Sequence, residues 1–146
     1  MLKLVRKFDC ALAISNFEKI PFKSTICLEI IMNLYLVDDE IDIAEVLAEA
    51  LELELEAQVK TFQSLDDCLI ALDQNPTPNV IICDVHMPTG SGLRLTSELE
   101  KRNLNIPHIF LTGMIDKLPP QKNAHMLRKP APMEVLIGKI KQIAQI

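Results

Sequence analysis

The chain has 146 residues, of which 49% are hydrophobic and 24% are charged, and its formal net charge is −5. This composition is typical of a globular domain and excludes a disordered or fibrous chain. An acidic chain with no tryptophan and one tyrosine offers little for a phosphate backbone or for base stacking, so we expect no direct nucleic-acid binding. No unbroken apolar run exceeds five residues, against the roughly 20 of a membrane-spanning helix, so we expect no membrane insertion.

The cysteines and histidines show no metal-ligand pattern. Cys10, Cys27, Cys68 and Cys83 form no C-x-x-C pair, and the three histidines are scattered. We interpret the cysteines as small buried thiols in a reducing compartment. The start of the chain lacks the continuous apolar segment and cleavage site of a signal peptide, so we expect a cytoplasmic protein.

The charge distribution divides the chain near Met32. Residues 1–31 carry five basic and three acidic side chains, whereas residues 32–146 carry ten basic and seventeen acidic ones. We therefore expect an N-terminal extension at 1–31, either a single helix or a poorly ordered segment. Residues 32–146 are expected to form one folded domain.

From Met32 onward, short apolar runs alternate with segments of helical periodicity. Strands are predicted at 34–37, 59–62, 80–83, 107–112 and 126–129. Helices are predicted at 41–51, 65–72, 93–99 and 133–146, with Ser64 and Asp67 forming a short capping box before the second. Such alternation predicts an α/β fold, with helices on both faces of a parallel sheet. His108 lies within an apolar strand pattern and is interpreted as structural.

Polar side chains lie at the ends of four of the predicted strands. Asp38 and Asp39 follow the first strand and Asp84 follows the third, while Thr112 ends the fourth and Lys129 ends the fifth. Because ligands bind beyond the carboxyl ends of parallel strands, we expect these groups to converge. Two carboxylates ~4 Å apart repel by about 4 kcal/mol at an effective dielectric of ~20, so the pattern indicates a hard cation such as Mg²⁺.

This arrangement favours phosphoryl chemistry at Asp84. An aspartate can carry a phosphoryl group covalently. The cation and Lys129 would neutralise charge on the transferring oxygens, and Thr112 would hydrogen-bond one of them.

Each strand-end residue also has an ordinary structural interpretation. The three acids Asp38–Glu40 can cap the N-terminus of the following helix and place favourable negative charge there. Asp84 can be a turn residue, Thr112 can cap the next segment and Lys129 can be a solvated charge. We favour a shared site because all of them lie at strand ends in a consistent order.

Four separated motifs support one family resemblance. They are Leu36–Glu40 (LVDDE), Ile81–Pro88 (IICDVHMP) with Gly92, Leu111–Gly113 (LTG) and Arg128–Pro130 (RKP). Residues 32–146 thereby resemble the receiver domain of a two-component response regulator, similar to the single-domain chemotaxis type. The resemblance implies a doubly wound, five-stranded parallel sheet of flavodoxin-like topology, with Mg²⁺ at its acidic end.

The resemblance also implies a role for each matching acid. Asp84 is implied to be the phosphoacceptor. Mg²⁺ is implied to be held by Asp38, Asp39, Asp84 and the backbone carbonyl of His86. The His86 side chain either tunes the lifetime of the phosphoryl group or is a solvated bystander.

On the basic side of the site, the resemblance implies that Thr112 is the hydroxyl that follows the phosphoryl group. Lys129 is implied to pair with Asp84 or its phosphoryl oxygens, and the bond between Lys129 and the following proline is expected to be cis.

Two departures from the family pattern affect the face of the domain that commonly carries the output signal. Met126 replaces the usual aromatic residue, and Pro119-Pro120 interrupts a short segment before Lys129. We predict one turn or an irregular loop in place of the helix that the family has between its fourth and fifth strands.

The leading hypothesis is a phosphoacceptor signalling domain, not an enzyme beyond its own phosphorylation and dephosphorylation. A sensor histidine kinase or a phosphotransfer protein would donate the phosphoryl group. With room for one helix after Pro132, we expect no attached effector and output through an unidentified protein target. The alternative is a receiver-like interaction module that works without phosphorylation, which Met126 and the short segment motivate. A metal-dependent phosphatase is disfavoured because His86 occupies the position of the second acid that such enzymes need.

Overall fold

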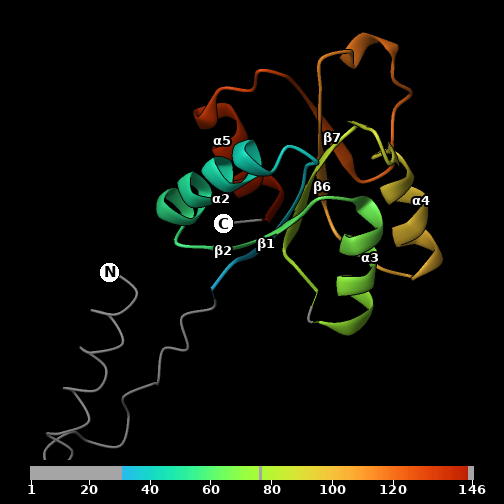
Figure 1. The fold of residues 1–146 in the computed structure, drawn as a ribbon, viewed down its shortest axis with the longest axis horizontal. Helices are drawn as coiled ribbons and strands as arrows, with labels where there is room; N and C mark the ends of the chain where they lie inside the picture. Colours follow the sequence, from blue (N-terminus) through green and yellow to red (C-terminus); the bar gives the residue numbers. More distant parts are fainter. Residues whose placement is uncertain (1–30, 76, 145–146) are drawn as a thin grey trace, which may run out of the picture. The chain divides into compact units, whose positions relative to one another are not determined.

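The structure is a computed structural model that describes residues 31–75 and 77–144 (Figure 1). The prediction for the N-terminal extension falls almost wholly outside these ranges. Within them, no helix has both the length and the apolar character needed to cross a membrane.

Five strands form one parallel sheet in the order β2-β1-β3-β6-β7. They are β1 (Asn33–Val37), β2 (Gln58–Phe62), β3 (Val80–Asp84), β6 (His108–Thr112) and β7 (Ala124–Arg128). Because β1 pairs with both β2 and β3, the strand order reverses beside β1. In doubly wound sheets this reversal places the ligand crevice beyond the carboxyl ends of β1 and β3. The predicted fold class is confirmed.

Helices cover both faces of the sheet (Figure 1). They are α2 (Ile41–Leu55), α3 (Leu65–Gln74), α4 (Arg94–Lys101) and α5 (Met133–Ala144). Apolar residues of α2 and α5 pack in one core, and those of α3 and α4 pack in a second core on the opposite face. Every residue of β3 and β6 is buried, as expected of strands covered on both sides.

The predicted N-cap of α3 is confirmed, but the Asp67 carboxylate accepts the Ser64 hydroxyl at 2.8 Å and not the backbone N–H that a capping box would use. Ser64 is the N-cap, and its hydroxyl oxygen accepts the backbone N–H of Asp67 at 3.1 Å. Such a cap satisfies one of the N–H groups that the first helical turn leaves without a partner. The start of α3, and with it the register of its apolar face, is therefore fixed locally.

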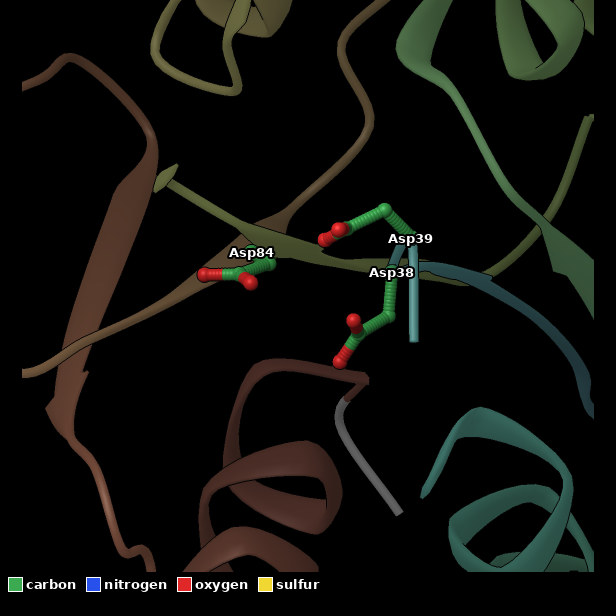
Figure 2. A group of neighbouring side chains, drawn as sticks. All are labelled: Asp38, Asp39 and Asp84. Atoms are coloured by element: carbon green, nitrogen blue, oxygen red, sulfur yellow. The ribbon is translucent and has the colours of Figure 1, made fainter. Parts of the chain in front are cut away.

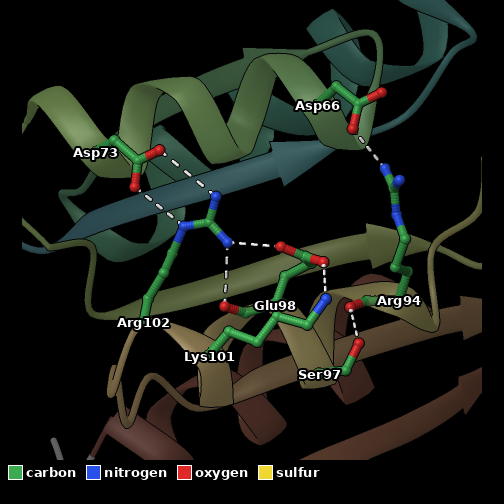
Figure 3. A network of polar contacts seen from close by, with 7 residues as sticks. All are labelled: Asp66, Asp73, Arg94, Ser97, Glu98, Lys101 and Arg102. Carbon is green, nitrogen blue, oxygen red and sulfur yellow. Dashed lines mark hydrogen bonds and ion pairs between the residues drawn. The ribbon is translucent and has the colours of Figure 1, made fainter.

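An ionic network joins α3 to α4 across the surface (Figure 3). The Arg102 guanidinium lies 3.0 Å from Asp73 Oδ1 on α3 and 2.7 Å from Glu98 Oε2 on α4. A second pair joins Arg94 to Asp66 near the first turn of both helices. Hydrogen bonds from Lys101 and Arg102 lower the pKa of Glu98 to about 2, so this carboxylate stays ionised at neutral pH.

His108 is structural, as the sequence indicated. The residue is 2% exposed, and its Nδ1–H donates to the Ile106 carbonyl oxygen at 2.9 Å. Nε2 is then free to accept the Thr96 hydroxyl, also at 2.9 Å. Burial is the main cause that lowers the pKa of His108, so the ring is neutral at pH 7.

The segment between β6 and β7 contains a single 3₁₀ turn, η1 (Ile115–Lys117). The resemblance implied a full helix between these two strands. The predicted loss of that helix is confirmed. Because one turn covers less surface than a helix, the first four residues of β7 are only partly buried. Leu118 and Met126 still pack against the core on this face.

Both predicted ends of the fifth strand were wrong. The fifth strand starts two residues earlier than predicted and ends at Arg128, so Lys129 lies just beyond it. The last helix is described as far as Ala144, and its predicted end at residue 146 lies outside the described residues. The turn after Asp84 contains a small antiparallel hairpin, β4 (His86–Met87) with β5 (Gly90–Ser91). Strands of two residues are too short to leave an alternating pattern.

Candidate functional site

Three carboxylates gather at the carboxyl ends of β1 and β3 (Figure 2). Val37 pairs with Cys83 in the ladder, so the next residues, Asp38 and Asp84, emerge side by side. Together with Asp39, they offer one carboxylate oxygen each, all within 4.8 Å of one another. Asp38 is 3% exposed and Asp84 is 6% exposed, so two of these acids are nearly shielded from water.

Lys129 brings a positive charge to the same place. Its Nζ lies 3.0 Å from Asp84 Oδ2 and 3.8 Å from Asp38 Oδ2. The backbone N–H of Lys129 donates to the Thr112 carbonyl oxygen at 2.9 Å, which anchors the residue beyond β7. The Lys129–Pro130 peptide bond is cis, as the resemblance implied. Lys129 is therefore an ion-pair partner in this state, not a solvated charge.

The electrostatics of Asp38 show that the negative charge is incompletely balanced. Burial is the main cause that raises its pKa, and the charges of Asp84 and Asp39 raise it further. The backbone N–H of Glu40, which donates to Asp38 Oδ1 at 2.9 Å, and the Lys129 ammonium oppose this rise. An all-oxygen donor set with excess negative charge fits a hard divalent cation such as Mg²⁺.

The acids after β1 do not cap α2 in the conventional way. The N-cap residue is Glu40, and it makes no side-chain capping hydrogen bond. Asp38 instead accepts the N–H of Glu40. The structure thus shows no side-chain cap by the N-cap residue, while the favourable charge of these acids at the helix N-terminus stays an alternative.

Asp84 is fixed by the segment that follows it. Its Oδ1 accepts the backbone N–H of His86 at 3.3 Å, while the His86 side chain is exposed. Gly92 packs directly on the backbone of Asp84, and a Cβ added there would lie 2.0 Å from the Asp84 carbonyl oxygen. The Gly92 N–H donates to the Val85 carbonyl oxygen at 2.9 Å, which holds this approach. The sequence showed Gly92 only as part of a motif, and its contact with Asp84 emerges from the fold.

Thr112 lies on the strand next to Asp84. β6 pairs with β3 so that Leu111 opposes Asp84, and Thr112 is the next residue. Its side chain is fully buried, and Oγ1 accepts the N–H of Met114 at 3.0 Å. The hydroxyl thus makes a local bond to the backbone two residues on, while the N-cap of the next segment is Met114 and not Thr112.

One polar contact near the site left no signal in the sequence. Arg128 donates to Asp116 Oδ2 at 2.6 Å and to the Gly113 carbonyl oxygen at 3.4 Å. These bonds join the η1 segment to the end of β7, one residue before Lys129. Asp116 lies in an irregular segment, where no periodicity predicts which side chain it meets.

Comparisons with known proteins agree with this geometry. A family model described as "Response regulator receiver domain" matches residues 34–141. A response regulator receiver domain protein from Clostridium thermocellum is 25% identical, with a TM-score of 0.68 over 79% of this chain and 95% of that one. The receiver domain of the Francisella response regulator 1452 is 24% identical, with a TM-score of 0.67 over 78% of this chain and 97% of that one. With the family model matching well over half of its length, the chain belongs to the response regulator receiver domain family.

Proposed function

We propose that this chain is a phosphoacceptor signalling domain in which Asp84 receives a phosphoryl group from a histidine kinase or a phosphotransfer protein. Receiver domains are regulatory phosphoacceptors of two-component systems. The observation that carries the proposal for this chain is the cluster of three carboxylates with Lys129 at 3.0 Å from Asp84.

The residues around Asp84 suit nucleophilic attack by its carboxylate. One carboxylate oxygen attacks the phosphorus of a phosphohistidine, an O–P bond forms, and the P–N bond breaks. The imidazole nitrogen leaves with the electron pair of that bond. The His86 N–H and the Lys129 ammonium orient the two oxygens of Asp84 before the attack. Lys129 also offsets negative charge on the transferring group.

Asp38, Asp39, Asp84 and the His86 carbonyl would hold Mg²⁺. When bound, the ion supplies positive charge beside the phosphoryl oxygens. The raised pKa of Asp38 supports this assignment, because the charges now present leave that buried acid poorly compensated. A divalent ion would remove the imbalance.

Thr112 is proposed to follow the phosphoryl group. Its hydroxyl now accepts from Met114, and its own proton can be donated to a phosphoryl oxygen. A turn of the side chain toward Asp84 would release the Met114 amide. The segment 113–118 would thereby respond to phosphorylation.

A downstream protein target and a cytoplasmic location complete the proposal. Both cysteines in the described ranges, Cys68 and Cys83, are free thiols, which suits a reducing compartment. A phosphorylation-independent interaction module remains the second candidate. The single turn η1 and the partly buried Met126 favour it, because they alter the face that usually carries the output.

Acetyl phosphate with Mg²⁺ separates the two candidates. We expect the intact mass of the full chain to increase by one phosphoryl group, and the increase to disappear with EDTA or in Asp84→Asn. An unchanged mass in the wild type, or an equal increase in the variant, would favour the interaction module. A circular dichroism spectrum of Asp84→Asn controls for folding.

A further inference from the structure

A small pocket lies where the first turn of α2 meets the end of β2. Its volume is about 110 Å³, which is enough for a group of a few heavy atoms. Pockets for drug-sized ligands measure about 300–1,000 Å³, so this pocket is too small for a nucleotide or a similar molecule. Its occupant must be a small group whose chemistry matches the residues around it.

Two of the lining residues are acids. Asp38 is 3% exposed, and Glu45 is an exposed residue of α2. None of the described residues that line the pocket is a lysine or an arginine. A cation is therefore the occupant that the charges of the pocket favour.

One oxygen of the Asp38 carboxylate accepts no hydrogen bond from the described residues. Oδ1 accepts the backbone N–H of Glu40 at 2.9 Å, whereas Oδ2 has only the Lys129 ammonium, at 3.8 Å. Every fully buried side-chain nitrogen or oxygen in the described part of the chain has a hydrogen-bond partner, so Oδ2 borders open space. This nearly buried oxygen can therefore accept a hydrogen bond from a ligand.

The other lining residues determine which kind of cation fits. Three of them, Ile41, Ala44 and Phe62, are apolar, and two, Thr61 and Gln63, can accept hydrogen bonds. A divalent metal ion takes oxygen ligands on nearly every side, so a partly apolar pocket does not suit it. An ammonium is compact and strongly hydrated, whereas a guanidinium is planar and weakly hydrated. A guanidinium can lie on apolar side chains and direct its N–H groups to carboxylates.

We propose that this pocket binds the guanidinium group of a small molecule, with Asp38 and Glu45 as its acceptors. The pocket is a different site from the crevice between the three carboxylates, but Asp38 belongs to both. A guanidinium and Mg²⁺ would bring positive charge to the same carboxylate, so each weakens the binding of the other by the same factor. This competition rests on the proposed function, through its Mg²⁺ site, whereas binding in the pocket does not.

The test titrates the full chain with N-butylguanidinium in EDTA and follows the amide NMR signals. We expect saturable shifts centred on residues 61–63 and on the first turn of α2, with a Kd on the order of 1 mM. Butylammonium has the same tail but a compact, strongly hydrated charge, so it should bind at least about tenfold more weakly. A capped Gly-Arg-Gly peptide, which presents the guanidinium on a peptide chain, should bind no more tightly than N-butylguanidinium.

Variants decide whether the lining residues carry the binding. Thr61→Ile fills part of the pocket and removes an acceptor, so it should weaken N-butylguanidinium at least about tenfold. Glu45→Gln keeps the shape of the side chain without its charge and should weaken it about threefold. Glu49→Gln is the matched control, because Glu49 is exposed on the same helix but does not line the pocket. Thermal unfolding of each variant confirms that the domain is folded.

A calorimetric titration with Mg²⁺ measures the competition. Saturating N-butylguanidinium should weaken Mg²⁺ binding by about fivefold, and Thr61→Ile should abolish this effect. Unchanged Mg²⁺ affinity would contradict the shared use of Asp38. A chain that binds N-butylguanidinium in EDTA but takes up neither Mg²⁺ nor a phosphoryl group would contradict the proposed function and support the assignment of the pocket.

Several results would overturn the assignment of the pocket. These are the absence of saturable shifts, equal affinity of the wild type and Thr61→Ile, equal binding of the guanidinium and the ammonium, and shifts centred on Asp39 and Asp84. Tighter binding of the capped peptide would also overturn it, because the guanidinium would then come from an arginine of another protein.

Discussion

The Cα of Gly92 lies so close to Asp84 that a Cβ there would sit 2.0 Å from the Asp84 carbonyl oxygen and 2.8 Å from the Cys83 sulfur. A turn residue eight positions after the acid therefore determines where the end of β3 lies. Only a residue without a side chain permits this approach, since both neighbours belong to the buried core.

We predict that Gly92→Ala displaces Asp84. Its main effect should be a slower rate of phosphorylation by acetyl phosphate, in a domain that still folds. The expected loss in the free energy of unfolding is about 1–3 kcal/mol, typical of overpacking. Gly138→Ala is the control, because a Cβ there meets nothing within 4 Å. In the helix α5 it should stabilise by about 0.5–1 kcal/mol and leave phosphorylation unchanged. A Gly92→Ala chain that is phosphorylated at the wild-type rate would contradict this account.

Removal of the Lys129 charge should separate metal binding from phosphorylation. Lys129→Met keeps most of the side-chain volume but removes the ammonium 3.0 Å from Asp84. Mg²⁺ should bind at least about threefold more tightly, because a repelling charge is gone. Phosphorylation should slow by about tenfold or more, because the charge that offsets the transferring oxygens is lost. Isothermal titration and phosphorylation rates measure the two effects.

The matched control for Lys129 is Lys141→Met, since Lys141 is exposed on α5. It should change neither quantity. Weaker Mg²⁺ binding by Lys129→Met would mean that the lysine helps to organise the metal site, against the electrostatic argument.

The raised pKa of Asp38 predicts a pH-dependent stability without metal. Its contribution to stability is fully present below the ordinary pKa of 3.8 and is lost as the pH rises through the raised value. Asp38→Asn should therefore stabilise the metal-free chain at pH 7, on the order of 1 kcal/mol, because a buried charge is removed. The rise in Tm on adding Mg²⁺ should shrink in the same variant.

Asp42→Asn controls for a general effect of removing acid. Asp42 lies in the first turn of α2, where a negative charge is favourable. Its neutralisation should destabilise the domain by about 0.3–1 kcal/mol. Urea unfolding at several pH values with EDTA measures both variants. Destabilisation of the metal-free chain by Asp38→Asn at pH 7 would show that the cluster is already balanced.

The Thr112 hydroxyl should control the segment that contains η1. Thr112→Val removes the acceptor of the Met114 N–H, at a cost of about 1 kcal/mol. Amide exchange at Met114 and in η1 should become faster. Thr112→Ser keeps the hydroxyl and should retain the protection at Met114. Equal exchange at Met114 in the wild type and Thr112→Val would contradict the anchoring role of this bond.

The sequence was sufficient for the main sheet and the helices that cover it, because each of these elements carries a local signal. Val80–Cys83 is an apolar run of strand length, and Ser64 is a capping residue, so periodicity and chemistry mark the ends. The double proline at 119–120 predicted that no full helix forms between β6 and β7, since proline disrupts a helix interior. The order of motifs at the strand ends then predicted which polar residues would meet.

The remaining features depend on contacts between distant segments. The approach of Gly92 to Asp84, the bond between Arg128 and Asp116 and the link from Arg102 to Asp73 join residues whose spacing in sequence has no period. The hairpin at His86–Ser91 is held by backbone bonds and leaves no alternating pattern. Such features follow from the packed structure and were not predictable from single residues.

The most direct test of the central claim is to locate the phosphoryl group in the chain. After treatment with acetyl phosphate and Mg²⁺, borohydride reduces an aspartyl phosphate to homoserine, which peptide mass spectrometry can assign to one position. We predict homoserine at position 84 alone, and none in the presence of EDTA. Homoserine at Asp38 or Asp39, or no reduced residue in a folded and Mg²⁺-bound chain, would contradict the account.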